Sequence, residues 1–256
     1  MLCICDFKQA HTRFQGLHII CRSSAETRAI RTKENQITGL RANALQHRAN
    51  RVLRNKFHNG RLQTLCASRQ IIDLDKKLKV VLDCGNAAGA VCAPEIFRNF
   101  NIDLEELYCD VDGTFPNHHP DPTVKENLKY LIEKMKTGRF DVGIAFDGDA
   151  DRIGVVDEKG DVIWADQLMA LFLPEIISPG DEILFDVKCS RSLEEMITKY
   201  GGKPIMWKTG HSLVKQKMLE LDCKFGGEMS GHIFFADDYF GYDDALYVSA
   251  RLPVSY

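Results

Sequence analysis

The sequence lacks the features that would place it in a membrane, in an oxidising compartment or among disordered proteins. Its longest apolar stretch, around 168–173, is far shorter than the roughly 20 residues of a membrane helix, so we expect no membrane association. No basic segment followed by an apolar run opens the chain, which argues against a signal peptide. The nine cysteines include no C-x-x-C pair, which favours reduced thiols in the cytoplasm over disulfides or a zinc site. Apolar residues make up 45% of the chain, which argues against disorder of the whole.

Proline, tryptophan and tyrosine are missing from residues 1–72, and acidic residues are scarce there. This segment holds 13 Lys and Arg against 3 Asp and Glu, a net charge of +10, whereas residues 73–256 hold 20 against 33, a net charge of −13. The change predicts a boundary near Asp73, after a basic leader that is irregular or partly helical over about 37–57. No motif or interleaved aromatic residues accompany the leader's arginines, which argues against nucleic-acid binding.

Alternating strands and helices fill the chain from residue 79 onward. Short apolar runs that end at turn residues predict strands, and apolar residues at helical spacing predict helices. The predicted strands are 79–84, 104–109, 142–146, 153–157, 162–165, 183–187 and 205–207, with further short strands after 224. The predicted helices are 89–100, 122 to a stop at Gly138, 166–177, 193–200, 212–221 and 243–252. This order predicts an α/β fold of two consecutive three-layer α/β domains, 73–163 and 164–256, with mixed, mostly parallel sheets.

Local chemistry predicts how three of these elements begin or join. Asp121 is expected to cap the helix that starts at Pro122, with Val124 on its apolar face. Asp166 is expected to cap the next helix along the chain. Lys159-Gly160 is expected to form a hairpin turn between two short strands.

The strongest chemical signal is FDGDADRIG, residues 146–154, where Asp147, Asp149 and Asp151 follow a buried strand directly. Crowded carboxylates repel one another unless a cation lies between them, and oxygen ligands favour a hard ion such as Mg²⁺. A calcium EF-hand is excluded because Arg152 stands where that loop needs glycine, and because strands flank the segment. A solvated acidic turn remains an alternative. Arg152 is expected to close the loop.

A second signal is GGEMSGH, residues 226–232, in which Glu228, Ser230 and His232 alternate. In an extended segment alternate side chains point the same way, and these three suit sugar hydroxyls. An ordinary glycine-rich turn between strands remains an alternative. Two weaker signals are His211 in WKTGHS, at a strand-to-helix junction, and Lys188 in DVKCSRS, at a strand end. Taken singly, a capping or core histidine explains the first signal equally well, and a lone lysine at a strand end usually faces solvent.

Three segments in this order and spacing resemble the α-D-phosphohexomutases, most closely the bacterial phosphomannomutase/phosphoglucomutase branch: FDGDADRIGVV, KTGHSLVKQKM and GGEMSGHIFF. VVLDCGNAAGAVCAP and DGTFPNHHPDPT belong to the same resemblance, which covers about residues 79–252. Met229 resembles the mannose/glucose branch, since phosphoglucosamine mutases typically have Gln there. Family members have four domains around a cleft, so the resemblance implies that this stretch is the second domain and most of the third.

The resemblance implies an isomerase that moves a phosphoryl group between the 1- and 6-positions of a hexose through a phosphoserine and a bisphosphorylated intermediate. The implied cofactors are Mg²⁺ and hexose 1,6-bisphosphate, and the implied partners are mannose and glucose 1- and 6-phosphates; no oligomeric state is implied. The implied metal ligands are Asp147, Asp149 and Asp151, the implied substrate-binding residues are Glu228, Ser230, His232, Lys188 and His211, and the implied catalytic residues are Arg152, Lys188, His211 and His232.

The sequence departs from the family in two places. It contains no T-[AG]-S-H-N-P phosphoserine loop, and Ser23, Ser24 and Ser68, the nearest candidates by position, are not followed by His-Asn-Pro. The phosphate clamp of a fourth domain is missing, and Pro253 interrupts the last predicted helix. We therefore expect an incomplete phosphohexomutase chain; the alternative is a non-catalytic remnant that binds Mg²⁺ or phosphosugar.

Overall fold

The structure is a computed structural model that describes residues 77–100 and 102–252. The predicted leader, with Ser23, Ser24 and Ser68, lies outside the described residues. Within those two ranges, no helix combines the length and the apolar character needed to cross a membrane. The elements are, in chain order, β1 (Leu78–Asp83), η3 (Ala88–Val91), α3 (Ala93–Arg98), β2 (Ile102–Leu107), η4 (Lys125–Leu128), α4 (Lys129–Met135), β3 (Val142–Phe146), β4 (Ile153–Val156), β5 (Val162–Ile163), α5 (Ala165–Ile176), β6 (Glu182–Asp186), α6 (Arg191–Lys199), β7 (Lys203–Trp207), α7 (His211–Leu221), β8 (Phe225–Gly227), β9 (Ile233–Phe235) and α8 (Ala245–Arg251).

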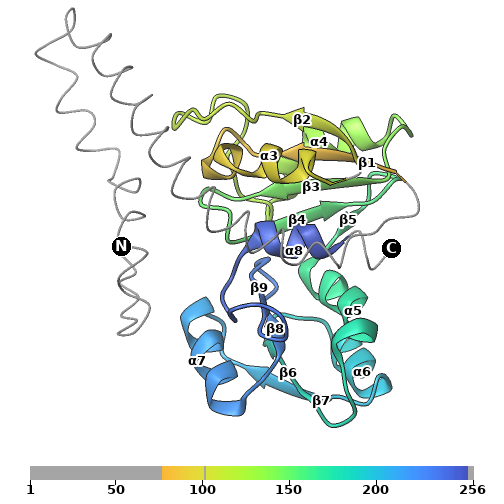
Figure 1. The fold of residues 1–256 in the computed structure, drawn as a ribbon, viewed down its shortest axis with the longest axis vertical. Helices are drawn as coiled ribbons and strands as arrows, with labels where there is room; N and C mark the ends of the chain where they lie inside the picture. The colour runs from red at the N-terminus through yellow and green to blue at the C-terminus, as the bar shows by residue number, and fades with distance from the viewer. Residues whose placement is uncertain (1–76, 101, 253–256) are drawn as a thin grey trace, which may run out of the picture. The chain divides into compact units, whose positions relative to one another are not determined.

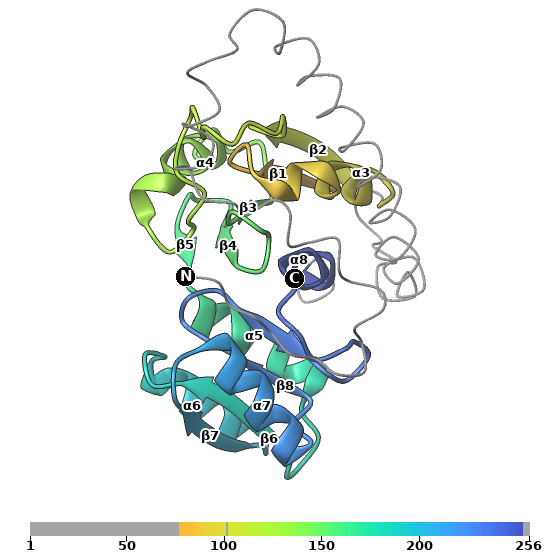
Figure 2. The ribbon, with the colours of Figure 1, turned by 90° about the vertical axis from the view of Figure 1, so that its left-hand side faces the viewer.

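The first sheet has five strands in the order β2-β1-β3-β4-β5 (Figure 1). β1 runs parallel to β2 and β3, whereas β3–β4 and β4–β5 are antiparallel. Successive side chains of a strand point to opposite faces, so Val80 and Leu82 join one apolar cluster while Val81 joins another. α4 packs its Leu131 and Met135 on the Val81 face, and α3 covers the other (Figure 2).

The second sheet has four strands in the order β7-β6-β8-β9, with only the β8–β9 pair antiparallel. The same alternation divides β6: Leu184 packs with α7, whereas Ile183 and Phe185 lie on the face covered by α5 and α6. Both sheets are therefore layered between helices, which confirms the predicted α/β class with mixed sheets.

One apolar core connects the two sheets. α5 contacts both β4 and β8, and its Phe172 is fully buried against the rings of Phe225 and Phe235. The last helix, α8, contacts β4 of the first sheet and β9 of the second (Figure 1). The shared core holds the ends of the two sheets against each other. The boundary between residues 163 and 164 stays a prediction.

Two predicted helix starts are wrong because the capping aspartate has another partner. The Asp121 carboxylate accepts hydrogen bonds from the backbone and hydroxyl of Thr123, and η4 begins later; Val124 is exposed. Asp166 lies inside the first turn of α5, whose N-cap is Trp164. Its buried carboxylate accepts the backbone N–H groups of Gln167 and of the distant Ser190, both at 2.9 Å.

The helix predicted over 89–100 is interrupted at Cys92, between η3 and α3. Pro94 lies in the first turn of α3, where its missing N–H costs nothing, whereas the interior of one long helix would lose a hydrogen bond at that position. The predicted turn at Lys159-Gly160 is confirmed: it joins the antiparallel β4 and β5, and Gly160 has a φ of +84°.

Candidate active site

Asp147 organises the loop that follows β3. Its carboxyl is only 2% exposed, and its Oδ1 accepts the backbone N–H groups of Asp151 and Arg152, both at 3.1 Å. Its Oδ2 accepts a hydrogen bond from Nε of Arg152 at 2.8 Å. The loop is therefore wrapped around its first carboxylate, and Arg152 closes it as the sequence predicts.

The three aspartates form a group that can hold a cation. One oxygen each from Asp147, Asp149 and Asp151 lies within 4.8 Å of the others. Burial, together with the charge of neighbouring carboxylates, raises the pKa of Asp147 and of Asp149, so the charged forms need compensation beyond the single guanidinium of Arg152. An oxygen-only set of three carboxylates fits a hard divalent ion. The group is thus a candidate metal site.

Arg152 also connects this loop to the segment DGTFPNHHPDPT. Its Nη1 lies 3.2 Å from Oδ1 of Asp121, so one guanidinium bridges Asp121 and Asp147. In the same segment His118 Nε2 lies 3.0 Å from both oxygens of the fully buried Asp83, at the end of β1. These two contacts fix the segment beside the aspartate loop.

Residues 228–231 form a tight turn, so the predicted extended segment is wrong. The Gly231 N–H donates to the carbonyl of Glu228 at 3.0 Å, and the Glu228 N–H donates to the carbonyl of His232 at 2.9 Å. Gly231 has a φ of +97°, and a Cβ there would lie 2.7 Å from the carbonyl oxygen of Ile153. The turn packs that closely because the N–H of Ile153 donates to Gly231. Only glycine allows this approach to β4.

The turn still brings its three polar side chains together. His232 Nδ1 lies 2.8 Å from Ser230 Oγ and 3.3 Å from Glu228 Oε2. Glu228 is 1% exposed, and its other oxygen accepts the backbone N–H of Gly210. The predicted neighbours are therefore adjacent, although turn geometry rather than strand alternation causes it.

His211 is the first residue of α7 and lies beside His232. The two rings stack with centroids 5.2 Å apart. His211 Nδ1 lies 2.8 Å from one oxygen of Asp243, and Nζ of Lys215 donates to the other oxygen at 2.8 Å. Burial works against the charge of Asp243, but Lys215 outweighs it and lowers the pKa. Sequence analysis missed Asp243, which lies outside the quoted motifs, and did not single out Lys215 within KTGHSLVKQKM.

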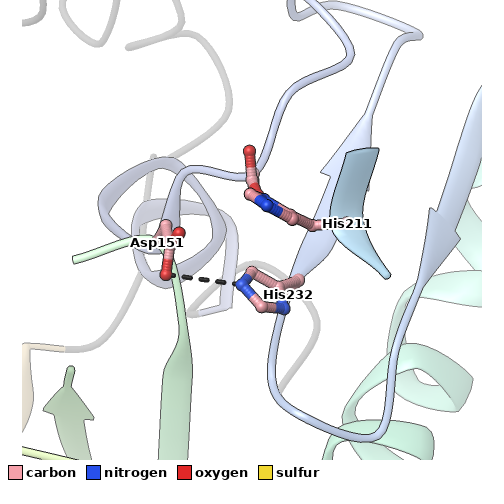
Figure 3. A group of neighbouring side chains, drawn as sticks. Asp151, His211 and His232 are labelled. Atoms are coloured by element: carbon pink, nitrogen blue, oxygen red, sulfur yellow. Dashed lines mark hydrogen bonds and ion pairs between the residues drawn. The ribbon is translucent and has the colours of Figure 1, made fainter. Parts of the chain in front are cut away.

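The turn meets the aspartate loop at His232. Its Nε2 lies 3.5 Å from Oδ1 of Asp151, and Figure 3 shows the imidazole turned toward that carboxylate with His211 beside it. Burial opposes protonation of His232, but Asp151 and Glu228 outweigh it and raise the pKa to about 9. The two strongest sequence motifs thus form one polar site.

Lys188 is not part of this cluster. It is exposed just beyond β6, and in the described ranges no hydrogen bond or ion pair involves it. The organising residue at that strand end is Asp186, which sequence analysis missed. Its fully buried carboxylate accepts the backbone N–H of Met229 at 3.1 Å and the hydroxyl of Thr209 at 2.8 Å. It therefore holds the turn next to the segment that carries His211.

Residues 64–160 match the family described as phosphoglucomutase/phosphomannomutase, alpha/beta/alpha domain II, and residues 164–253 match its alpha/beta/alpha domain III. The chain belongs to the phosphoglucomutase/phosphomannomutase family. This is a family of phosphohexomutases, which are isomerases, so the resemblance found in the motifs is confirmed.

Named relatives agree with this assignment. A phosphomannomutase/phosphoglucomutase of Pseudomonas aeruginosa is 52% identical over 186 residues, which are 72% of this chain and 40% of that protein. A phosphoglucomutase of Neisseria meningitidis is 46% identical over 183 residues, 71% of this chain and 40% of that protein. The chain thus spans about two fifths of the length of the curated relatives it matches.

A solved structure has the same fold. A phosphoglucomutase/phosphomannomutase family protein of Burkholderia thailandensis superposes with a TM-score of 0.73 at 44% identity, over 77% of this chain and 43% of that one. A second solved structure, from Thermus thermophilus, has a TM-score of 0.68 at 19% identity, over 77% of this chain and 46% of that one, and supports the fold alone.

Proposed function

We propose that this chain carries the metal-binding and sugar-binding parts of a phosphomannomutase/phosphoglucomutase. The enzyme would interconvert hexose 1-phosphates and hexose 6-phosphates of mannose or glucose through a hexose 1,6-bisphosphate. The observation that carries the proposal is the 3.5 Å approach of His232 to Asp151, because it places the polar turn next to the aspartate loop. Phosphoryl transfer depends mainly on positioning and on neutralising charge, and this site offers both.

The aspartate loop would hold Mg²⁺ through Asp147, Asp149 and Asp151, and the ion would neutralise charge on the transferred phosphoryl group. Arg152 would keep the loop in shape through its bonds to Asp147 and Asp121. A guanidinium has five N–H donors, so the remaining ones can pair with a substrate phosphate.

The turn would recognise the sugar. Ser230 and Glu228 lie side by side around His232 and can bond to ring hydroxyls. Nε2 of His232 faces Asp151 at 3.5 Å, where the imidazole can hold or accept a proton near the reacting oxygen. His211 lies against it. The exposed Lys188 would contribute positive charge toward a phosphate from the end of β6.

A chimera tests the proposal. The matched 186-residue segment of the Pseudomonas aeruginosa relative is replaced by the corresponding segment of this chain, and conversion of glucose 1-phosphate is measured in a coupled assay. We expect turnover, and we expect Glu228→Ala to reduce transition-state stabilisation by about 1–3 kcal/mol in kcat/KM. Glu220→Ala, on the exposed side of α7, is the matched control and should leave kcat/KM unchanged.

The 256-residue chain is assayed beside the chimera, with Mg²⁺ and glucose 1,6-bisphosphate. We expect no turnover, because its sequence has no T-[AG]-S-H-N-P loop to donate the phosphoryl group. A chimera that binds glucose 1-phosphate in calorimetry but never converts it would contradict the proposal and favour a non-catalytic phosphosugar-binding role.

A further inference from the structure

A second group of metal-ligating side chains lies beside the aspartate loop. Asp151, His211, His232 and Asp243 each offer one ligand atom, and these atoms all lie within 4.8 Å of one another. They come from the loop after β3, the start of α7, the turn after β8 and the segment before α8. Four distant parts of the chain therefore converge on one point, part of which Figure 3 shows.

The ligand set differs from that of the three aspartates. Two imidazole nitrogens and two carboxylate oxygens suit Zn²⁺, Co²⁺ or Ni²⁺, whereas Mg²⁺ prefers oxygen ligands and waters. We propose that Asp151, His211, His232 and Asp243 bind a divalent transition-metal ion of this kind. The site is distinct from the aspartate group and shares only Asp151 with it.

The surroundings of His232 support the assignment. Its Nδ1 is engaged by Ser230 and by the buried carboxylate of Glu228, which leaves Nε2 directed at Asp151. Metal-ligating histidines commonly have this arrangement, with the second ring nitrogen bonded to a carboxylate that fixes the ring orientation. Lys215 performs the same orienting role for Asp243, because it holds the oxygen that does not face His211.

Charge and access also permit an ion. Asp151 and Asp243 carry two negative charges and Glu228 adds a third, against the positive charges of Lys215 and of Arg152, whose Nε lies 3.9 Å from Asp151. A bound ion takes the place of the proton on His232, so the affinity for the metal should fall as pH falls. His211 is 29% exposed and Asp151 is 25% exposed, so an ion can enter from solvent. It would take the place of the present hydrogen bond between His211 and Asp243.

The shared Asp151 makes the two metal sites antagonistic. An ion on the histidine side uses the same Asp151 carboxylate as an ion in the aspartate group, and two divalent ions that share one carboxylate repel each other. If the proposed function holds, the same ion would also occupy the two histidines that face the sugar phosphate, so it would act as an inhibitor. The binding test below does not depend on that consequence.

Cobalt binding to the full 256-residue chain tests the site. Co²⁺ in a mixed nitrogen and oxygen site gives visible d–d absorption, which is titrated for the wild type and for variants, with circular dichroism as the check of folding. We expect His211→Asn and His232→Asn each to abolish the band. Glu228→Gln should weaken Co²⁺ affinity by about 10–100-fold, the usual effect of losing an outer-shell carboxylate.

Two variants separate this site from others on the chain. Asp149→Asn removes a ligand of the aspartate group alone and should keep the Co²⁺ band, and His119→Gln, at an exposed histidine, is the matched control that should also keep it. A band that survives in both His211→Asn and His232→Asn, or no band in the wild type, would overturn the proposal. Should His232→Asn fail to fold, Asp243→Asn replaces it with the same expected loss.

Discussion

The aspartate loop and the glycine-rich turn contribute to one site, but their polar groups are held in different ways. Asp147 is satisfied by residues four and five positions further along its own loop. Glu228 depends on Gly210, 18 positions away, and His211 depends on Asp243, 32 positions away. The first part is therefore organised by its local sequence, whereas the second exists only once the second sheet and its helices have packed.

The polar groups of the two regions are held separately, but both regions pack against the same apolar core. Phe172 lies between the two sheets with ring contacts to Phe225 and Phe235, and the same cluster extends to Val80 and Leu82 of β1. The aspartate loop and the glycine-rich turn are thus positioned by one shared apolar core. Four substitutions, ordered from the largest expected effect to the smallest, test this comparison.

Phe172→Ala should have the largest effect. It removes a fully buried ring from the shared core and should lower the free energy of unfolding by about 3–5 kcal/mol. Urea unfolding followed by circular dichroism and tryptophan fluorescence should show one transition, shifted as a whole. Leu219→Ala, at a side chain that is 72% exposed, is the control and should change little. A separate, unshifted transition of the first sheet would show that the regions do not share a core.

Glu228→Gln tests whether the turn depends on distant partners. The buried charged hydrogen bonds to Gly210 and His232 become neutral ones, which should cost about 1–2 kcal/mol of unfolding free energy. Amide chemical shifts should change around Gly210 as well as in the turn. Glu220→Gln on α7 serves as the exposed control. Chemical-shift changes confined to residues 226–232 would show that the turn, like the aspartate loop, is held by contacts within its own segment.

The His118–Asp83 pair gives a pH dependence to the first region. The hydrogen bond to Asp83 outweighs burial and raises the pKa of His118 above its usual value of about 6.5. Its stabilising contribution is therefore complete below that pH and is lost as pH rises through the raised pKa. We expect a smaller effect than that of Glu228→Gln, because neutral His118 can still donate one hydrogen bond.

The measurement for His118 is the urea midpoint of the wild type minus that of His118→Asn, taken from below pH 6.5 to above the raised pKa of His118. The difference should shrink as pH increases. His119→Asn provides the control at an exposed neighbour and should show no such trend. A difference that grows with pH would mean that the His118–Asp83 pair stabilises the fold more when His118 is neutral than when it is protonated.

Asp121→Asn should have the smallest effect. Asp121 and Arg152 are each about a quarter exposed, and such pairs contribute about 0.2–1 kcal/mol. The aspartate loop should keep its shape, because Arg152 retains its bond to Asp147. Thermal unfolding gives the size of the change, and Asp161→Asn is a comparison on a nearby exposed turn. A loss as large as that of Phe172→Ala would show that this loop, too, depends on a distant partner.

Sequence was sufficient where the partners lie close along the chain. The buried strand and the spacing of Asp147, Asp149 and Asp151 predict a carboxylate group, and Arg152 closes the loop from the next position. The turn at Gly160 follows from glycine's tolerance of positive φ. The α/β class follows from alternating strand and helix patterns, because strands that are buried on both faces have short continuous apolar runs and helices have apolar residues at helical spacing.

Tertiary structure decided what local propensity could not. Asp121 and Asp166 have the chemistry of helix caps, but Arg152 and the N–H of Ser190 are their partners in the fold. Residues 228–231 turn instead of extending, because the close approach of Gly231 to β4 fixes that geometry. Besides the local bonds of Asp121 to Thr123 and of Asp166 to Gln167, these contacts join residues far apart along the chain, so no local pattern contains them.

The set of residues that make up the site was likewise decided by contacts between distant parts of the chain. The sequence identified His211, His232 and Asp151 singly, but it gave no reason to join them to Asp243 or to Asp186. Attraction between charged and polar groups depends on their distance in the folded chain, and that distance is set when α5 and α8 pack both sheets into one core. The residue types were therefore readable from the sequence, whereas their assembly into a single polar site was decided by the shared apolar core.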